Sequence, residues 1–308
     1  MCLKRPKLIA VVGPTASGKT TLGVEIARRF NGEVVSFDSM QIYNNMPIAS
    51  AAPTAEETLG VPHHLVGFCD PNDKFSVADF IALATEKIAD ITARGRLPVL
   101  VGGTGLYIDS LVSGIEFSDE DSTEVRRRLE AKADEIGMEK MLELLREIDP
   151  ITAEKYHIND RKRIIRALEI FELHGKPKSQ LDAESKANGN RYDAVWIGIT
   201  YRDRERLYDR INRRVDIMLE NGVLAEAEAA FKNGGKTSVQ AIGHKEFFPY
   251  FKGEILLETA VENLKMETRR YAKRQLTWFR RNKDINWIYA DEAPDVLAKA
   301  EKIIKERM

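Results

Sequence analysis

The sequence predicts an α/β protein, in which a parallel sheet of the P-loop type is flanked by helices and interrupted by an inserted all-helical domain. Three observations lead to this prediction. Strand and helix signals alternate over roughly the first hundred residues, a complete phosphate-binding loop follows the first strand, and helix patterns without strands fill residues 118–190. We therefore expect a catalytic core in residues 1–117 and 191–308, with the inserted helical domain between them.

Length and composition limit the class of protein. A chain of 308 residues suggests about two domains, and its formal net charge of −1 argues against a protein that coats polyanions. Cys2 and Cys69 form no CxxC pair, so neither a disulfide framework nor a zinc site is expected. The apolar runs are too short to span a membrane and no leader opens the chain, so we expect a cytoplasmic protein. We also expect a monomer.

The most informative motif is the loop at residues 13–20. An apolar strand at 8–12 precedes it, and Leu22, Ile26 and Phe30 follow at helical spacing. The loop reads Gly13-Pro14-Thr15-Ala16-Ser17-Gly18-Lys19-Thr20. Glycines let successive backbone N–H groups point at phosphate oxygens in front of a helix N-terminus. We expect a bound di- or triphosphate, with Lys19 on its terminal phosphate and the Thr20 hydroxyl on Mg²⁺; a chance Gly-Lys-Thr turn would lack the strand and helix around it.

The remaining elements follow from periodicity and capping. Ser76 and Asp79 form a capping-box variant ahead of an apolar helical stripe that Gly95 closes. Further strands are expected at 33–37, 98–101, 194–200 and 285–289, helices at 122–136, 138–148, 160–173 and 254–281, and a turn-like stretch at 185–191.

An acidic residue ends the second predicted strand. Because the carboxyl ends of parallel strands line the ligand crevice, Asp38 should face the bound phosphate and act as a base rather than as a helix cap. The strand at 98–101 ends in Gly-Gly-Thr-Gly, without the acid that holds Mg²⁺ in ATP-hydrolysing proteins. This argues against a motor or a switch, although a small-molecule kinase remains compatible.

Histidines and basic runs point less clearly to a site. His63 and His64 are adjacent, so their side chains should diverge, and we expect core or loop roles rather than metal binding. Arginines and lysines gather at 126–128, 161–163, 202–214 and 269–283, where solvated helix faces are the common explanation. Within the second run, Lys162, Arg163 and Arg166 share one helix face, which suits RNA phosphates.

Several motifs occur in a fixed order along the whole chain. They are GPTASGKT at 13–20, DSMQIY at 38–43, VPHHL at 61–65, LVGGTGLY at 100–107, NDRKR at 159–163, RINRRVD at 210–216, QAIG at 240–243 and RYAKRQ at 270–275. In this order the motifs resemble those of the bacterial tRNA dimethylallyltransferases (tRNA isopentenyltransferases). The resemblance implies transfer of a dimethylallyl group from dimethylallyl diphosphate to N6 of the adenine on the 3′ side of a tRNA anticodon, with Mg²⁺ as cofactor and the anticodon stem-loop as partner.

The resemblance also implies roles for single residues. Asp38 would accept the proton of the adenine amine, Thr104 would hydrogen-bond the departing oxygen, and Lys19 and Arg214 would hold the diphosphate. Residues implied to contact the tRNA are Asp38, Ser39, Met40, Gln41, Thr104, Arg126, Lys162, Arg163, Arg166, Gln240, Gly243, His244 and Lys245. Base flipping is expected, since N6 is inaccessible in a stacked loop. His244 stands where the family usually has tyrosine, and it offers less area for stacking.

Two other functions are compatible with parts of the sequence. A small-molecule or nucleoside kinase would use the same phosphate loop, and a nucleotide-gated RNA-binding protein would use it without catalysis. Both leave the ordered set of motifs unexplained.

Overall fold

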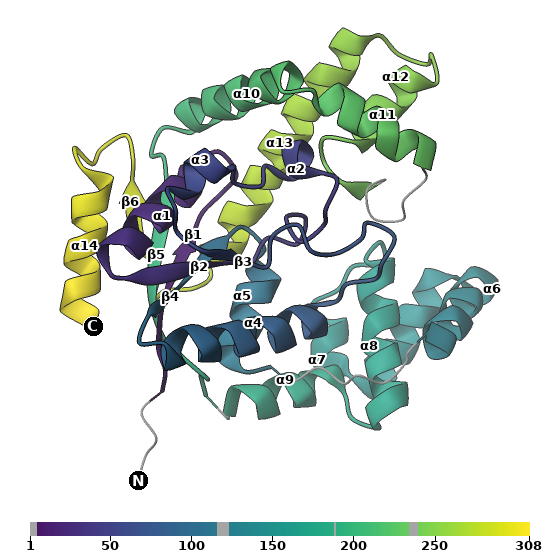
Figure 1. Cartoon of the computed structure of the whole chain (residues 1–308). Helices are drawn as coiled ribbons and strands as arrows, with labels where there is room; N and C mark the ends of the chain where they lie inside the picture. The colour runs from purple at the N-terminus through teal and green to yellow at the C-terminus, as the bar shows by residue number, and fades with distance from the viewer. Residues whose placement is uncertain (1–4, 116–122, 188, 234–239) are drawn as a thin grey trace. The chain divides into compact units, whose positions relative to one another are not determined.

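The computed structural model of the chain describes residues 5–115, 123–187, 189–233 and 240–308 (Figure 1). Its internal contacts divide it into two compact units. The first unit comprises Met1–Val112 and Arg191–Met308, and the second comprises Ser113–Asn190. The expected boundary at residue 118 lies outside the described residues.

A six-stranded sheet forms the centre of the first unit. Its strand order is β3-β2-β4-β1-β5-β6, and all neighbouring strands are parallel. The strands are β1 Lys7–Val12, β2 Gly32–Ser36, β3 His63–His64, β4 Leu97–Gly102, β5 Asp193–Thr200 and β6 Asn286–Tyr289. The predicted α/β class with a parallel sheet is therefore confirmed.

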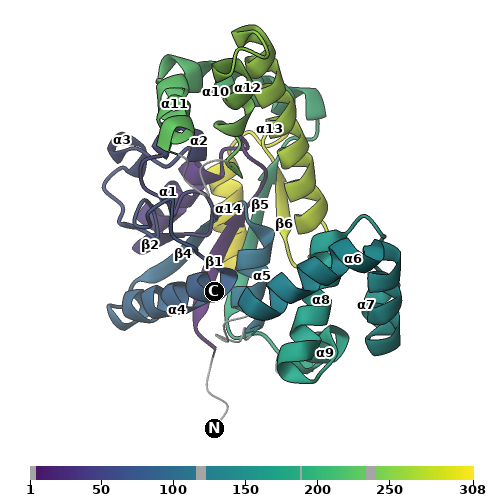
Figure 2. The same ribbon diagram turned by 90° about the vertical axis from the view of Figure 1, so that its right-hand side faces the viewer.

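Both faces of the sheet are covered by helices, as a parallel sheet requires (Figure 2). In β1, Ile9 and Val11 belong to the apolar cluster that includes residues of α1 (Lys19–Arg29) and α14 (Val296–Arg307). Leu8, Ala10 and Val12 belong to the cluster on the other face, with α4 (Val77–Ala93) and α5 (Gly105–Ser113). The predicted capping box of Ser76 and Asp79 starts α4.

Further helices of the first unit surround the carboxyl ends of the strands. They are α2 Pro47–Ser50, α3 Ala55–Thr58, α10 Arg204–Glu220, α11 Val223–Asn233, the 3₁₀ turn η2 Lys245–Phe247, α12 Phe248–Phe251 and α13 Leu257–Phe279. In the part of the chain that the structure describes, no helix combines the length and apolarity needed to cross a bilayer.

The described part of the second unit is helical and has its own apolar core. Its helices are α6 Thr123–Ile148, α7 Pro150–Ala153, α8 Arg161–His174 and α9 Lys178–Ala187. The predicted break between residues 136 and 138 is confirmed, because Gly137 adopts φ 83° inside α6. The predicted helix start at Ser122 lies outside the described residues. Leu129, Met141, Leu145, Ile164 and Leu168 are among the buried core residues.

The predicted turn-like stretch at 185–191 is wrong for residues 185–187, which belong to α9. This polar helix is stabilised at its start, where the backbone N–H of Ser179 donates to Asp149 at 2.8 Å. The ammonium of Lys176 also binds Glu184, at 3.0 Å. Sequence periodicity did not reveal these contacts, because they come from outside the helix or from its polar face.

Candidate active site

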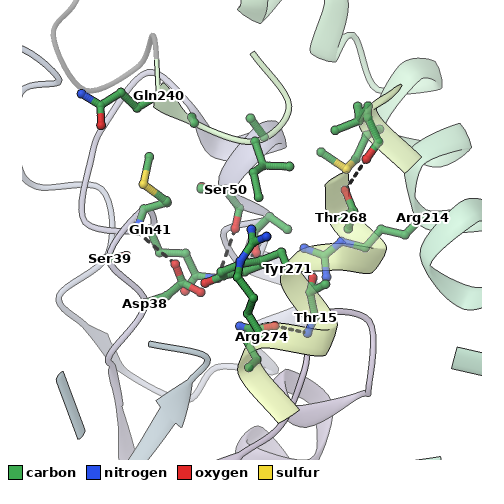
Figure 3. Close-up of a pocket in the computed structure, with 18 of the residues that line it drawn as sticks. Thr15, Asp38, Ser39, Gln41, Ser50, Arg214, Gln240, Thr268, Tyr271 and Arg274 are labelled. Atoms are coloured by element: carbon green, nitrogen blue, oxygen red, sulfur yellow. Dashed lines mark hydrogen bonds between the residues drawn. The ribbon is translucent and has the colours of Figure 1, made fainter. Parts of the chain in front are cut away.

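A cavity of about 330 Å³ lies at the carboxyl ends of the strands in the first unit (Figure 3). Two groups of residues line it. The first, which we call the phosphate-loop wall, consists of Thr15, Lys19, Thr20, Asp38, Ser39, Met40, Gln41, Ala49, Ser50 and Ala51. The second, which we call the distal wall, consists of Arg214, Met218, Gln240, Ala241, Ile242, Lys245, Leu264, Thr268, Tyr271, Arg274 and Gln275. The cavity thus collects many of the predicted site residues.

The backbone of the phosphate loop has the conformation that phosphate binding needs. Gly18 has φ 95° directly before α1, a conformation that glycine adopts readily. At Gly13 a Cβ would lie 2.4 Å from the carbonyl oxygen of Ile199, so only glycine fits. Pro14, Ala16 and Ser17 complete the loop without lining the cavity, and the buried hydroxyl of Ser17 has no partner among the described residues.

Lys19 and Arg214 bring two positive charges to the cavity. The pKa of Lys19 is lowered to about 8, first by burial and then by the charge of Arg214, while Asp38 acts in the opposite direction. Burial likewise lowers the pKa of Arg214. Because a bound anion would relieve this repulsion and favour both charges, the pair is suited to an anionic ligand.

Asp38 holds one carboxylate oxygen in place and leaves the other available. Its Oδ1 accepts the backbone N–H of Met40 at 3.0 Å, which fixes the side chain over the turn after β2. No residue in the described ranges donates a hydrogen bond to its Oδ2. In Figure 3 the carboxylate of Asp38 lies beside Tyr271, and burial raises the pKa of that phenol. Asp38 is therefore positioned to accept a proton from a ligand in the cavity.

Thr104 lies beside this turn but does not line the cavity. Its hydroxyl oxygen accepts the backbone N–H of Ser39 at 3.0 Å. It also donates to the Ser39 hydroxyl at 3.3 Å. The structure thus shows Thr104 holding the segment after Asp38, and the expected contact with a departing oxygen stays a prediction.

Gln275 joins the two walls. Its Oε1 accepts the backbone N–H of Thr15 at 2.8 Å, and its Nε2 donates to the carbonyl oxygen of Gly103 at 3.0 Å. A Cβ at Gly103 would lie 2.0 Å from that nitrogen, so glycine is required there. One side-chain amide on α13 therefore fixes the distance between the phosphate loop and the end of β4.

Comparison with known proteins gives a consistent result. Residues 41–282 match the model of the IPP transferase family, and residues 6–64 match that of isopentenyl transferases. The chain belongs to the IPP transferase family. A tRNA dimethylallyltransferase of Acetivibrio thermocellus is 49% identical over 97% of this chain and 95% of its own length.

Solved structures agree with this membership. The tRNA isopentenylpyrophosphate transferase of Bacillus halodurans superimposes with a TM-score of 0.72 at 44% identity, covering 98% of this chain and 97% of that one. A eukaryotic dimethylallyltransferase described as acting on tRNA gives a TM-score of 0.85 at 30% identity, covering 98% of this chain and 80% of the other.

In this member of the family, His244 does not present its ring to the cavity, contrary to the expectation of an RNA contact. Its side chain is 1% exposed, and its Nε2 lies 2.9 Å from the Glu226 carboxylate. The same carboxylate accepts the backbone N–H groups of Ile48 and Ala49, both at 2.9 Å. Gly243 is also buried, with φ 105°, against Ala49. His244 therefore connects segments behind the cavity and is too deeply buried in this structure to stack on a base.

Other predicted RNA contacts are already engaged within the protein. The Gln41 amide donates to the Ala51 carbonyl at 3.0 Å, and its oxygen accepts the Ser36 hydroxyl at 2.9 Å. In the second unit, Arg126 and Arg166 both bind the buried carboxylate of Glu169. The side chains of Lys162 and Arg163 are exposed, and Arg163 contacts Asp160 at 3.2 Å.

Several residues of the distal wall were not predicted from the sequence to belong to the site, and one hydrogen bond from α10 to the phosphate loop was not predicted either. Thr268, Tyr271, Arg274 and Gln275 lie at spacings of three or four on α13, a signal that a search for one polar helix face would have found. Arg210 was expected to be merely solvated, yet its Nε donates to the carbonyl oxygen of Ala16 in the phosphate loop at 2.9 Å.

Proposed function

We propose that this chain transfers the dimethylallyl group of dimethylallyl diphosphate to N6 of the adenine on the 3′ side of a tRNA anticodon, releasing diphosphate. The observation that carries the proposal is one cavity that combines an anion site with a carboxylate whose Oδ2 is available. A diphosphate leaving group and a weakly nucleophilic amine need these two features together. Family membership supports the same reaction.

Charge separation is the main demand of this reaction. The allylic C–O bond breaks, a C–N bond to the adenine N6 forms, and negative charge develops on the departing diphosphate. Lys19, Arg214 and the backbone N–H groups of the loop stabilise that charge, because they are held in place before it develops. The proton lost from N6 passes to Asp38 as the C–N bond forms.

The residues of the loop also fit a divalent cation. The Thr20 side chain lines the cavity beside Lys19, and hard hydroxyl oxygens suit Mg²⁺. We propose that Thr20 holds Mg²⁺, which supplies further positive charge to the diphosphate when bound. The protein residues keep the roles already given: they bind the diphosphate, orient it and accept the proton.

The tRNA is bound through both units in this proposal. Ser39, Met40, Gln240 and Lys245 line the cavity and would contact the flipped adenine and its neighbours. In the second unit, exposed Lys162 and Arg163 would contact phosphates of the anticodon stem. Arg126 and Arg166 would join them, because both side chains remain partly exposed while they bind Glu169. A tRNA substrate is consistent with a cytoplasmic enzyme.

The deciding experiment follows the fate of two labels. The full chain is incubated with Mg²⁺, unmodified tRNA and dimethylallyl diphosphate labelled in the allyl group, and the tRNA is digested to nucleosides. We expect label in N6-isopentenyladenosine. In a parallel reaction, γ-labelled ATP replaces the allylic donor, with nucleosides as acceptors. Phosphate transfer without allyl transfer would establish a kinase, and tRNA binding without either transfer would establish a non-catalytic RNA-binding protein.

A further inference from the structure

A second, much smaller cavity adjoins the first at the phosphate loop. Its volume is about 10 Å³, which is about the lower limit for one water molecule. Lys19, Thr20 and Gln41 line both cavities. The other lining residues are Val34, Ser36, Pro53, His63, Val101 and Gly102. The small cavity is therefore lined by Thr20, the same residue that is proposed to hold the cation.

His63, which lines the small cavity, has a buried imidazole nitrogen without a partner among the described residues. Its Nδ1 lies 2.8 Å from the carbonyl oxygen of Val61. Because a carbonyl only accepts, Nδ1 must carry the proton, which leaves Nε2 as a lone-pair acceptor in the neutral ring. This Nε2 is buried, and no described residue donates to it. Burial lowers the pKa of His63, so the ring stays neutral at pH 7.

The neighbouring histidine shows that this arrangement is specific to His63. His63 and His64 form β3, in which successive side chains point to opposite faces. The Nε2 of His64 lies 2.7 Å from the buried carboxylate of Glu33, which also binds Arg94 and Arg96. The Nε2 of His64 is thus bound within the protein, whereas the buried Nε2 of His63, a residue that lines the small cavity together with Thr20, has no partner among the described residues.

We propose that His63 Nε2 accepts a hydrogen bond from a water molecule of the divalent cation held by Thr20, and that the small cavity accommodates this water. The inference rests on the proposed function. Mg²⁺ retains several of its waters when bound, and these polarised waters are strong hydrogen-bond donors that require an acceptor with a free lone pair. An imidazole lone pair meets this need, while the ammonium of Lys19 does not. His63 is then a positioning residue for the cation site, without being a direct ligand.

Metal binding tests this inference without relying on turnover. Mn²⁺ replaces Mg²⁺ as the probe, inorganic diphosphate is added, and free Mn²⁺ is followed by electron paramagnetic resonance. His63→Asn keeps a donor for the Val61 carbonyl but loses the acceptor at the Nε2 position, and we expect it to weaken Mn²⁺ binding roughly 10-fold or more, as loss of an outer-shell partner does. His63→Gln carries an oxygen near the Nε2 position and should bind Mn²⁺ within about twofold of the wild type.

His64→Asn is the matched control, since it removes the adjacent imidazole on the opposite face, and we expect its Mn²⁺ affinity to match the wild type. Thermal melting checks that each variant is folded. Unchanged affinity in His63→Asn would overturn the proposal, as would equal weakening in His63→Asn and His64→Asn. Weakening in His63→Gln equal to that in His63→Asn would also overturn it, because the acceptor would not be the cause. Failure of wild-type protein to prenylate tRNA would instead refute the proposed function, independently of these affinities.

Discussion

The two walls of the main cavity differ in how the chain builds them. In the phosphate-loop wall, the loop at 13–20 and the turn after Asp38 each follow directly from a strand end, so local sequence determines most of their shape. The distal wall comes from α10, α13 and the segment around Ala241, which are far in the chain from the phosphate loop. It is held by single long-range contacts such as those of Gln275 and Glu226. The proposed base and most of the diphosphate site therefore lie on the phosphate-loop wall, while the distal wall adds Arg214 and aligns the reactants.

Loss of the base on the phosphate-loop wall should have the largest effect. Asp38→Asn keeps the size of the side chain and the acceptor for the Met40 amide, but it cannot take up the proton of the amine. We expect the single-turnover rate of allyl transfer to fall by roughly 10²–10⁴, the range typical of general bases, with diphosphate affinity nearly unchanged. Rapid-quench measurements with labelled donor give the rate. A rate equal to that of the wild type would remove Asp38 from this role.

Breaking the link between the walls should have the next largest effect. Gln275→Leu removes both the acceptor for Thr15 and the donor to Gly103, so the phosphate loop loses its tether to α13. Misplacement by about 1 Å lowers rates by up to 10²-fold, and we expect kcat/KM to fall by roughly that factor. Gln180→Leu, which alters a surface glutamine of α9, is the matched control. If both variants kept full activity, the walls would not depend on this amide for their alignment.

The same contrast explains what could be predicted from the sequence. The strand ends, the phosphate loop, the Ser76 capping box and the break at Gly137 depend on neighbouring residues, and the structure confirms each of them. A polar helix face could have pointed to Gln275 as a site residue, but the hydrogen-bond partners of Gln275 and Arg210 lie 260 and 194 residues away, and no local pattern identifies them. The burial of His244 could not be predicted for the same reason, because its environment is determined by Glu226 on another helix.

A smaller effect is expected from the contact that joins α2, which carries Ala49 of the phosphate-loop wall, to the segment of the distal wall around His244. Glu226 accepts two backbone N–H groups of α2 and lies 2.9 Å from His244, with its side chain only 8% exposed. Glu226→Gln replaces one carboxylate oxygen by an amide N–H₂ group, so a donor would face one of the backbone N–H groups and an acceptor would be lost. We expect a loss of about 1.5–3 kcal/mol in the free energy of unfolding, typical of hydrogen bonds to a charged group. We also expect a higher KM for tRNA, with the KM for dimethylallyl diphosphate little changed.

Urea denaturation and steady-state kinetics measure these two quantities. Glu228→Gln is the matched control, because that carboxylate lies on the same helix and contacts the surface residue Lys232. Equal stability and equal KM for tRNA in the two variants would show that the Glu226 contacts do not support the distal wall.

The smallest effect is expected in the number of protons that the protein takes up when diphosphate binds. This number tests whether Lys19 is fully charged before the ligand binds. Burial and the charge of Arg214 lower the pKa of Lys19 to about 8 in the free protein, so a substantial fraction of the molecules lacks this charge at pH 8. A bound diphosphate stabilises the charged form of Lys19 and raises its pKa. Binding must therefore take up protons at and above pH 8, and the uptake by Lys19 must vanish below about pH 6.5.

Calorimetry in two buffers of different ionisation enthalpy should give an uptake by Lys19 of roughly half a proton at pH 8. Diphosphate itself titrates in this range, but Lys19→Arg provides the correction, because arginine stays charged throughout. An uptake identical in the wild type and Lys19→Arg would mean that Lys19 is already fully charged in the free protein, and that burial and Arg214 do not hold the loop in the state described here.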